Sequence, residues 1–272
     1  MAAASAEGLA QGYGDRFSGV GRLFGAAGLE RLRAARVCIV GVGGVGSWAV
    51  EALARCGIGA IDMIDLDDVC VTNVNRQLPA LDGQIGRPKV DVLAERIRAI
   101  NPECRIEAVA EFLTKSTAAR LLSAPYDFVI DAVDRVAHKC GIISACRDEG
   151  VPVLTVGGAG GKRDGSAVRV ADLGESKQDE LLRQLRRQLR REYGFPTGEG
   201  VTFGVPCVYS AEKPVFPWSN GTVCSAPEPG CDLHLDCRAG FGTAAFVTGA
   251  FGLAAAGEVV KRIASSDSSD AS

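Results

Sequence analysis

The sequence has little net charge and no closely paired cysteines. Its 30 basic and 33 acidic residues leave a formal net charge of −3, so no global positive field marks the chain as a nucleic-acid-binding protein, and any basic surface must be local. Ten cysteines are present, but none forms a Cys-x-x-Cys pair, the spacing from which structural zinc sites are usually built. These absences argue against a zinc-binding module.

The N-terminus also lacks the basic segment and long apolar segment of a secretory signal. We therefore interpret the cysteines as reduced thiols of a cytoplasmic protein, in which free cysteine is commonly a small buried apolar residue. Residues 239–257 carry no charge and just reach the length of a membrane span. They are rich in Gly and Ala and are followed directly by charges, which favours a helix that is buried or lies at a subunit interface.

Apolar stretches typical of strands alternate with helical segments between residues 37 and 156. We expect strands at 37–41, 60–65, 105–113, 127–131 and 151–156, and helices at 46–55, 89–100, 117–122 and 136–149. This alternation predicts an α/β fold, with a Rossmann-like open, mainly parallel sheet covered by helices on both faces. Ligands of such sheets bind beyond the carboxyl ends of the strands, where the strand order reverses.

The predicted domain organisation places one nucleotide-binding core at residues 16–165 and a C-terminal extension of the same domain at 166–263. A flexible N-terminus at 1–15 and a disordered tail at 264–272 would flank them, and 16–35 would form one or two short helices. In the extension we expect strands at 167–173 and 204–210, a helix at 176–193, and a long proline-rich loop at 194–236 that could act as a lid.

The helix expected at 176–193 carries five arginines at spacings that place them on adjoining faces. They are Arg183, Arg186, Arg187, Arg190 and Arg191. Both a solvated surface helix and a contact with RNA phosphates fit this pattern.

A glycine-rich turn follows the first predicted strand. Gly41, Gly43 and Gly46, with Gly44 between them, have the spacing in which the first glycine permits a sharp bend, the second admits phosphate oxygens and the third allows helix and strand to pack closely. Asp65, at the end of the second predicted strand, is placed to accept hydrogen bonds from ribose hydroxyls. These features predict a nucleotide pocket and by themselves fit NAD, FAD or ATP.

The polar residues that follow the ribose carboxylate favour a triphosphate. They are Asp67, Asn73, Arg76, Gln77 and Lys89. Attack of a carboxylate on the α-phosphate of ATP builds negative charge that Arg, Lys and Mg²⁺ stabilise, so Arg76 and Lys89 are the candidate catalytic cations.

Asp134 lies just beyond the apolar strand that ends at Asp131, and it is the candidate ligand for Mg²⁺, which prefers oxygen ligands and needs few from the protein. Alternatives remain open: Arg76 as a surface ion-pair partner, Asp134 as the cap of the next helix, and NAD-dependent oxidoreduction as the activity.

These residues resemble the adenylating domain shared by ThiF, MoeB and ubiquitin-activating enzymes. The resemblance rests on Gly41-x-Gly43-Gly44-x-Gly46, Asp65-x-Asp67, Asn73-x-x-Arg76-Gln77, Gly86-x-Pro88-Lys89, Asn101-Pro102 and Asp131-x-x-Asp134. Further motifs resemble the tRNA threonylcarbamoyladenosine dehydratase branch: Gly21-Arg22-Leu23-Phe24-Gly25, DDVCVTN at 67–73, TVGGAGG at 155–161 and GTVC at 221–224. Together they extend from about residue 16 to residue 262.

The resemblance implies an ATP- and Mg²⁺-dependent, AMP-forming enzyme that acts on threonylcarbamoyl-adenosine in tRNA. The free carboxylate would be adenylated with release of pyrophosphate, and a ureido atom would then close a ring and expel AMP. It also implies residue roles: Asp65 would hold the ribose, Asn73, Arg76 and Lys89 the phosphates and Asp134 the metal, while Arg22 would reach the triphosphate across a homodimer.

The resemblance also raises questions about partners and thiols. The missing zinc cysteines weaken the alternative of ThiF/MoeB-type adenylation of a sulfur-carrier or ubiquitin-like protein, and a sulfur-transfer protein is a further candidate partner. Cys207 and Cys237, the latter close to His234, lie in motif-like contexts, but a catalytic thiolate needs a depressed pKa.

Overall fold

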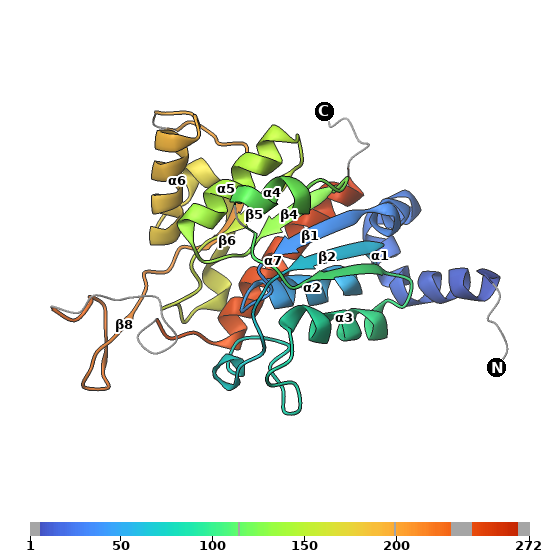
Figure 1. The fold of residues 1–272 in the computed structure, drawn as a ribbon, viewed down its shortest axis with the longest axis horizontal. Coiled ribbons are helices and arrows are strands. Elements are labelled where there is room, and N and C mark those ends of the chain that lie inside the picture. The colour runs from blue at the N-terminus through green and yellow to red at the C-terminus, as the bar shows by residue number, and fades with distance from the viewer. Residues whose placement is uncertain (1–5, 114, 199, 230–240, 266–272) are drawn as a thin grey trace.

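A seven-stranded sheet forms the centre of the molecule, which we describe from a computed structural model over residues 6–113, 115–198, 200–229 and 241–265 (Figure 1). The strand order is β3-β2-β1-β4-β5-β7-β6. The strands are β1 (Arg36–Val40), β2 (Ala60–Ile64), β3 (Arg105–Val109), β4 (Phe128–Asp131), β5 (Val153–Val156), β6 (Val168–Asp172) and β7 (Pro206–Ser210). All neighbours are parallel except β6 and β7, which confirms the predicted mainly parallel Rossmann-like sheet.

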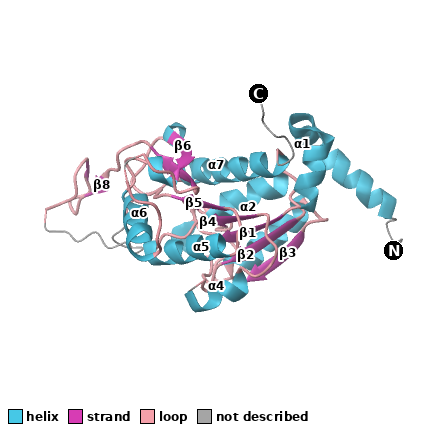
Figure 2. Ribbon diagram, turned by 90° about the horizontal axis from the view of Figure 1, so that it is seen from above, coloured by secondary structure: helices cyan, strands magenta, loops and turns pink. Residues whose placement is uncertain are grey.

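Helices cover both faces of this sheet (Figure 2). One face carries α1 (Ala6–Ala34), α2 (Gly46–Arg55), α3 (Lys89–Ile100) and α7 (Ala245–Ala264), and the other carries α4 (Lys115–Leu121), α5 (Val136–Asp148) and α6 (Glu180–Glu192). Strands β6 and β7 lie in the segment predicted to be a C-terminal extension and join the same sheet as the core strands.

Alternation along β1 divides the core into two layers. Val37 and Ile39 pack with α2, α3 and α7, whereas Cys38 and Val40 pack with α5 and its neighbours, because successive strand side chains point to opposite faces. With a layer of helices on each side, β1, β4 and β5 have almost no exposed residues. This burial explains their nearly continuous apolar sequences.

The uncharged segment near the C-terminus is confirmed as a buried helix, but its bounds differ from those predicted. Helix α7 begins at Ala245 and continues through the charges at Glu258, Lys261 and Arg262, which lie on its outer side. A Cβ atom at Gly252 would lie 2.5 Å from a backbone oxygen of the α2 N-terminus, so the small residues permit close packing of the two helices. Within the described ranges, no helix is long and apolar enough to cross a membrane.

Other segments also depart from the sequence predictions. Strand β3 ends at Val109, four residues before the predicted end. Residues 6–15, expected to be loose, are the first turns of α1, whose Tyr13 is buried and donates to the Gly57 carbonyl at 2.6 Å; the helix bends at Gly25. Helix α6 starts four residues late because the Asp179 side chain caps it. The long proline-rich loop contains a small hairpin, β8 (Phe216–Pro217) and β9 (Val223–Cys224), in addition to β7.

Candidate active site

The glycine turn lies where the strand order reverses, at the carboxyl ends of β1 and β4. Gly41 has a φ of 85°, and a Cβ atom there would lie 3.1 Å from the Ala132 carbonyl group in the loop after β4. A Cβ atom at Gly46 would lie 1.9 Å from the Gly41 carbonyl oxygen. Both glycines are therefore required by the backbone geometry, and the turn presents its amides at the edge where such sheets bind ligands.

Asp65 lies beside this turn with its carboxylate held by backbone amides. Its Oδ2 accepts the Val42 N–H at 2.7 Å and its Oδ1 accepts the Asp67 N–H at 2.9 Å. Burial raises the pKa of Asp65, although Lys89 and the two amides oppose that effect. Each oxygen retains a lone pair, so the carboxylate can also accept hydrogen bonds from a diol.

Lys89 and Asn73 line the loop that follows β2. The Lys89 side chain is almost fully buried, and its Nζ lies 2.8 Å from Oδ2 of Asp67, a side chain that is 60% exposed. The buried Asn73 uses its Oδ1 to accept the Cys70 N–H in a short 3₁₀ turn, which leaves its NH₂ as the group that could donate to a phosphate. The structure thus brings a cation and an amide to the edge of the glycine turn.

Arg76 and Gln77 pack directly on the glycine turn. The Arg76 Cγ lies 3.7 Å from the Cβ position of Gly44, and its guanidinium donates to the Thr72 carbonyl at 2.7 Å. Among the described residues Arg76 makes no ion pair, which does not support the surface ion-pair alternative. Gln77 is buried, and its Oε1 has no hydrogen-bond partner. Gln77 therefore keeps an acceptor oxygen beside this turn that a donor group of a ligand could use.

The aspartate that ends β4 and the one three residues later face opposite ways. Asp131 is fully buried and pairs with Lys139, whereas Asp134 is exposed, and no hydrogen bond engages its carboxylate within the described part of the chain. The N-cap of α5 is Arg135, without a side-chain cap bond, so Asp134 does not cap that helix. An outward carboxylate at the ligand edge fits Mg²⁺, which takes one or two carboxylates together with phosphates and waters. The described residues contain no cluster of three metal-binding side chains.

Arg22 and Cys207 lie apart from these groups. Helix α1 is anchored at the amino ends of the strands, for example through Tyr13 and Gly57, so the exposed Arg22 is at the edge of the sheet opposite its own glycine turn. Cys207 is fully buried, and desolvation raises the pKa of its thiol to about 12, which contradicts a catalytic thiolate. Cys237 and His234 lie outside the described residues.

Sequence reasoning missed the residues that support the site. Trp48 Nε1 and Thr248 Oγ1 both donate to the Arg76 carbonyl at 3.1 Å, and so they fix the backbone of that arginine from α2 and α7. Lys139 and Thr155 hold Asp131 from α5 and β5. A lysine inside an otherwise apolar helix face was the one sequence signal available for this second group.

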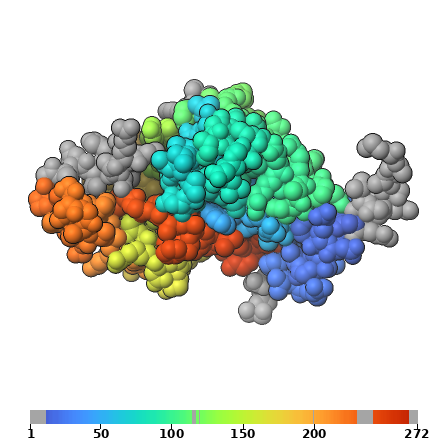
Figure 3. Space-filling view, turned by 90° about the horizontal axis from the view of Figure 1, so that it is seen from below, coloured from blue at the N-terminus to red at the C-terminus, as the bar shows by residue number. Residues whose placement is uncertain are grey.

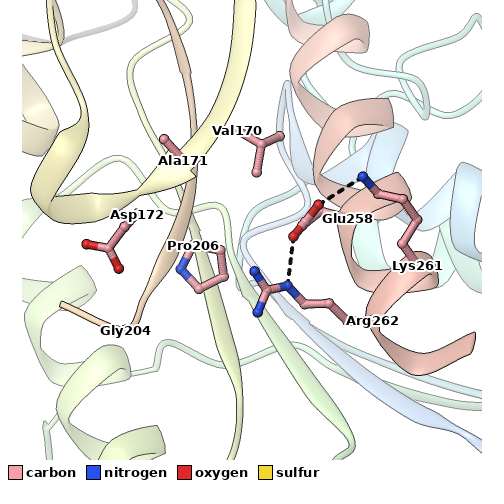
Figure 4. A pocket seen from close by; sticks show the side chains of 8 residues that line it. All are labelled: Val170, Ala171, Asp172, Gly204, Pro206, Glu258, Lys261 and Arg262. Carbon is pink, nitrogen blue, oxygen red and sulfur yellow. Dashed lines mark hydrogen bonds and ion pairs between the residues drawn. The ribbon is translucent and has the colours of Figure 1, made fainter. Parts of the chain in front are cut away.

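A groove of about 390 Å³ lies elsewhere, between β6, β7 and the second half of α7 (Figure 4). Its charged residues are already partnered: Glu258 pairs with Lys261 and Arg262, and Asp172 accepts backbone amides. Pro206 begins β7 and is the register partner of Asp172, so the groove opens at the amino edge of the parallel strands. It is therefore distinct from the glycine-turn site.

Several large apolar side chains are exposed beside the glycine turn. Figure 3 shows the loop of residues 66–86 (cyan) lying against the start of α7 (red). The exposed side chains, between 44% and 66% accessible, are Leu66, Val71, Val74, Leu81, Ile85 and Phe246. So much exposed apolar surface on neighbouring segments is typical of an interaction surface.

Comparison with known proteins gives concordant results. A family model described as the ThiF family matches residues 19–271. The tRNA threonylcarbamoyladenosine dehydratase of Escherichia coli (strain K12) is 46% identical over 257 residues, which cover 94% of this chain and 96% of that protein.

Two solved structures of the E. coli tRNA N6-threonylcarbamoyladenosine dehydratase TcdA are also similar. The complex with AMP has a TM-score of 0.82 at 41% identity and covers 97% of this chain and 98% of that one. The complex with ATP has a TM-score of 0.81 at 41% identity and covers 96% of this chain and 97% of that one.

Proposed function

The chain belongs to the ThiF family, and from this we propose that it is an ATP-dependent, AMP-forming enzyme that dehydrates threonylcarbamoyl-adenosine in tRNA. The free carboxylate of the modified base attacks the α-phosphorus of ATP, and the bond to pyrophosphate breaks. A ureido atom then attacks the acyl carbonyl, loses its proton and expels AMP. The net change is the loss of one water from the nucleoside as ATP becomes AMP and pyrophosphate.

The observation that carries the proposal is the convergence of a glycine turn, a diol-binding carboxylate and two cations at one edge of the sheet. Asp65 is tied to the turn through Val42, Arg76 lies on the loop after β2, and Lys89 is the first residue of α3. Relatives along nearly the whole chain are named dehydratases of this type, and their solved complexes contain ATP and AMP. Two cations beyond the ribose favour a triphosphate over the less charged diphosphate of NAD.

Each assigned residue has a role that its geometry permits. Asp65 accepts the ribose hydroxyls, and the NH₂ of Asn73 donates to the phosphates. Arg76 and Lys89 stabilise the negative charge that develops on the α-phosphate and on pyrophosphate. Gly41, Gly43, Gly44 and Gly46 let the backbone approach the nucleotide, and Asp67 and Gln77 complete the polar wall. Asp134 would hold Mg²⁺, which would neutralise charge on the phosphate oxygens.

We place Arg22 in the active site of a second copy of the chain. Its own glycine turn lies at the opposite edge of the sheet, and the exposed apolar residues of the 66–86 loop offer a surface for a homodimer. Mixing Arg22→Ala and Arg76→Ala proteins tests this directly. Each variant should be inactive alone, and subunit exchange should restore activity by forming one intact site per mixed dimer. No recovery after demonstrated exchange would refute the assignment.

The function is tested with ATP, Mg²⁺ and tRNA that carries threonylcarbamoyl-adenosine, followed by mass analysis of the digested nucleosides. The parent protein should remove one water and form AMP. Arg76→Ala and Asp134→Ala should abolish this change while thermal unfolding stays close to that of the parent. Arg98→Ala, an exposed arginine at the far end of α3, is the control. Full turnover by both site variants would show that the site is wrongly assigned.

A tRNA substrate bears on the cellular location of the protein and on its binding partners. A tRNA-modifying enzyme with free thiols fits the cytoplasm, and a sulfur-transfer protein remains a candidate partner that capture with purified protein can test. The arginines of α6 are candidate tRNA contacts. Arg187 is exposed and points away from the core, whereas Arg186 donates to the Leu173 carbonyl and Arg190 stacks on Phe203, so only part of this charge is free to meet RNA.

A further inference from the structure

A fully buried ion pair lies beneath the loop that follows β4. Lys139 Nζ on α5 is 3.1 Å from Oδ2 of Asp131, the last residue of β4, and neither side chain is exposed. Thr155 of β5 is also fully buried and donates to the same oxygen at 2.6 Å. One carboxylate therefore joins β4, β5 and α5.

Cohesion of the core does not by itself account for this pair. Desolvating two charges costs most of what their attraction returns, and apolar replacements of buried pairs are often neutral or stabilising. The surroundings are largely apolar, since Val129, Cys140 and Ile143 are fully buried in the same layer of the core, with the buried Asp179 as a further carboxylate that interacts with Lys139. The role of the charges must then be sought in what the second oxygen of Asp131 contacts.

That second oxygen holds the loop which closes the nucleotide site. Oδ1 of Asp131 accepts the Val133 N–H at 3.3 Å, and the Ala132 N–H donates to the Val40 carbonyl at 2.9 Å. This backbone lies directly against the glycine turn, because a Cβ atom at Gly41 would be 3.1 Å from both the Ala132 carbonyl and the Val133 nitrogen. Asp134 is the next residue.

We propose that Lys139 and Asp131 are positioning residues for the nucleotide site. Lys139 and Thr155 keep the Asp131 carboxylate turned inward, Asp131 fixes the loop of residues 132–134, and the loop directs Asp134 toward the phosphates and their metal. The inference rests on the proposed function, because it assigns Asp134 to Mg²⁺. It also explains why Asp131, three residues from Asp134, is not itself a metal ligand.

Two double variants separate the effect of the Val133 hydrogen bond to Asp131 from the effect of the two charges. Asp131→Asn/Lys139→Met removes both charges but keeps an oxygen that can accept the Val133 N–H. Asp131→Leu/Lys139→Met removes the same charges and also the acceptor. Both remove the pair without leaving one of its two charges unpaired. The Leu variant also takes the acceptor from the Val133 N–H and from the buried Thr155 hydroxyl, so it should unfold at a lower temperature than the Asn variant. Thr155→Val, which removes only one anchor of Asp131, is a milder third variant.

ATP binding is measured by calorimetry over a range of Mg²⁺ concentrations, and exchange of the Val133 amide is followed by NMR. The Leu variant should need about tenfold more Mg²⁺ for half-maximal tightening of ATP binding, as the loss of groups that orient metal ligands typically causes, and its Val133 amide should exchange faster. The Asn variant should resemble the parent in both measurements. Thr155→Val should change both in the direction of the Leu variant, but less.

The outcomes are distinguishable. If the Leu variant matches the parent in metal dependence and amide exchange, the positioning role is wrong. If the Leu variant does not fold, the same conclusion follows from a Thr155→Val protein that matches the parent. If the Asn variant is as defective as the Leu variant, the charges act by another route than Val133, and the proposal is likewise wrong. Failure of the proposed function differs from both, because the parent itself would then remove no water from threonylcarbamoyl-adenosine in tRNA, whether or not it binds ATP.

Discussion

Replacement of Asp65 by asparagine should weaken ATP binding strongly. The carboxylate accepts two backbone amides, from Val42 and Asp67, and the proposed ribose hydroxyls bind its remaining lone pairs. In Asp65→Asn one oxygen becomes an NH₂ group that faces a backbone donor, and the charge is lost. A hydrogen bond to a charged group contributes about 1.5–3 kcal/mol, so loss of one such bond should lower ATP affinity by about 10- to 140-fold.

The pH dependence gives this prediction a second test. Burial raises the pKa of Asp65, and ribose binding needs the ionised form, so ATP affinity should begin to fall on acidification at a higher pH than for an ordinary aspartate with a pKa of about 3.9. ATP itself also titrates, and this contribution cancels when the binding free energy of Asp65→Asn is subtracted from that of the parent at each pH. The folding stability of the nucleotide-free protein should change in the opposite direction with pH. The raised pKa of Asp65 contributes stability that is fully present below the pKa of the unfolded state and is lost as pH rises through the pKa of the folded state.

The assay is calorimetric titration with ATP, with thermal unfolding of each protein alongside. Asp68→Asn, which removes an exposed negative charge only three residues away, is the matched control and should bind ATP as the parent does. Equal affinities for parent, Asp65→Asn and Asp68→Asn would refute the assignment of Asp65 to the ribose. A well-folded Asp65→Asn protein with weakened binding, whose remaining response to acidification is that of ATP alone, would support it.

Three further predictions follow from burial and packing. Cys207→Ala should keep its dehydratase activity, because burial raises the pKa of that thiol to about 12. The small cavity should lower the free energy of unfolding by about 1 kcal/mol. Loss of turnover in a folded variant would instead indicate that Cys207 is catalytic. Gly252→Val should destabilise the protein by about 1–3 kcal/mol in chemical denaturation, since its Cβ would lie 2.5 Å from the α2 backbone, whereas Gly257→Ala, in open space on the same helix, should not; equal midpoints would contradict the close packing. Arg183→Gln/Arg187→Gln should weaken tRNA binding chiefly at low salt, and unchanged affinity in a filter-binding series would make α6 an ordinary solvated helix.

The part of the site that depends on local spacing could be predicted from sequence. The glycine turn needs residues close together in the chain, and both Gly41 and Gly46 are where their neighbours leave no room for a Cβ atom. Asp65 could be predicted because it ends a strand beside that turn. The helices on either side of these residues could be predicted for the same reason, because their patterns are local in the chain. Helices α2 and α3 have the expected bounds.

The remainder depends on contacts that spacing does not encode. Asp131 meets Thr155 only because β4 and β5 pair in a register that makes them direct neighbours, so the sequence could not show which aspartate of the pair faces inward. Arg22 could be assigned only by resemblance, since the fold places it far from its own turn. The start of α6 was misplaced because a side-chain cap at Asp179 decided it.

The anchoring of Arg76 by the last helix has a consequence for synthesis of the protein. Thr248, which donates to the Arg76 carbonyl, is 172 residues further along the chain, and domains fold as they leave the ribosome from the N-terminal end. A nascent chain can thus form its glycine turn long before the arginine beside it is secured. Premature termination ahead of α7 should therefore yield a product in which the Arg76 carbonyl keeps its bond from Trp48 but lacks the one from Thr248.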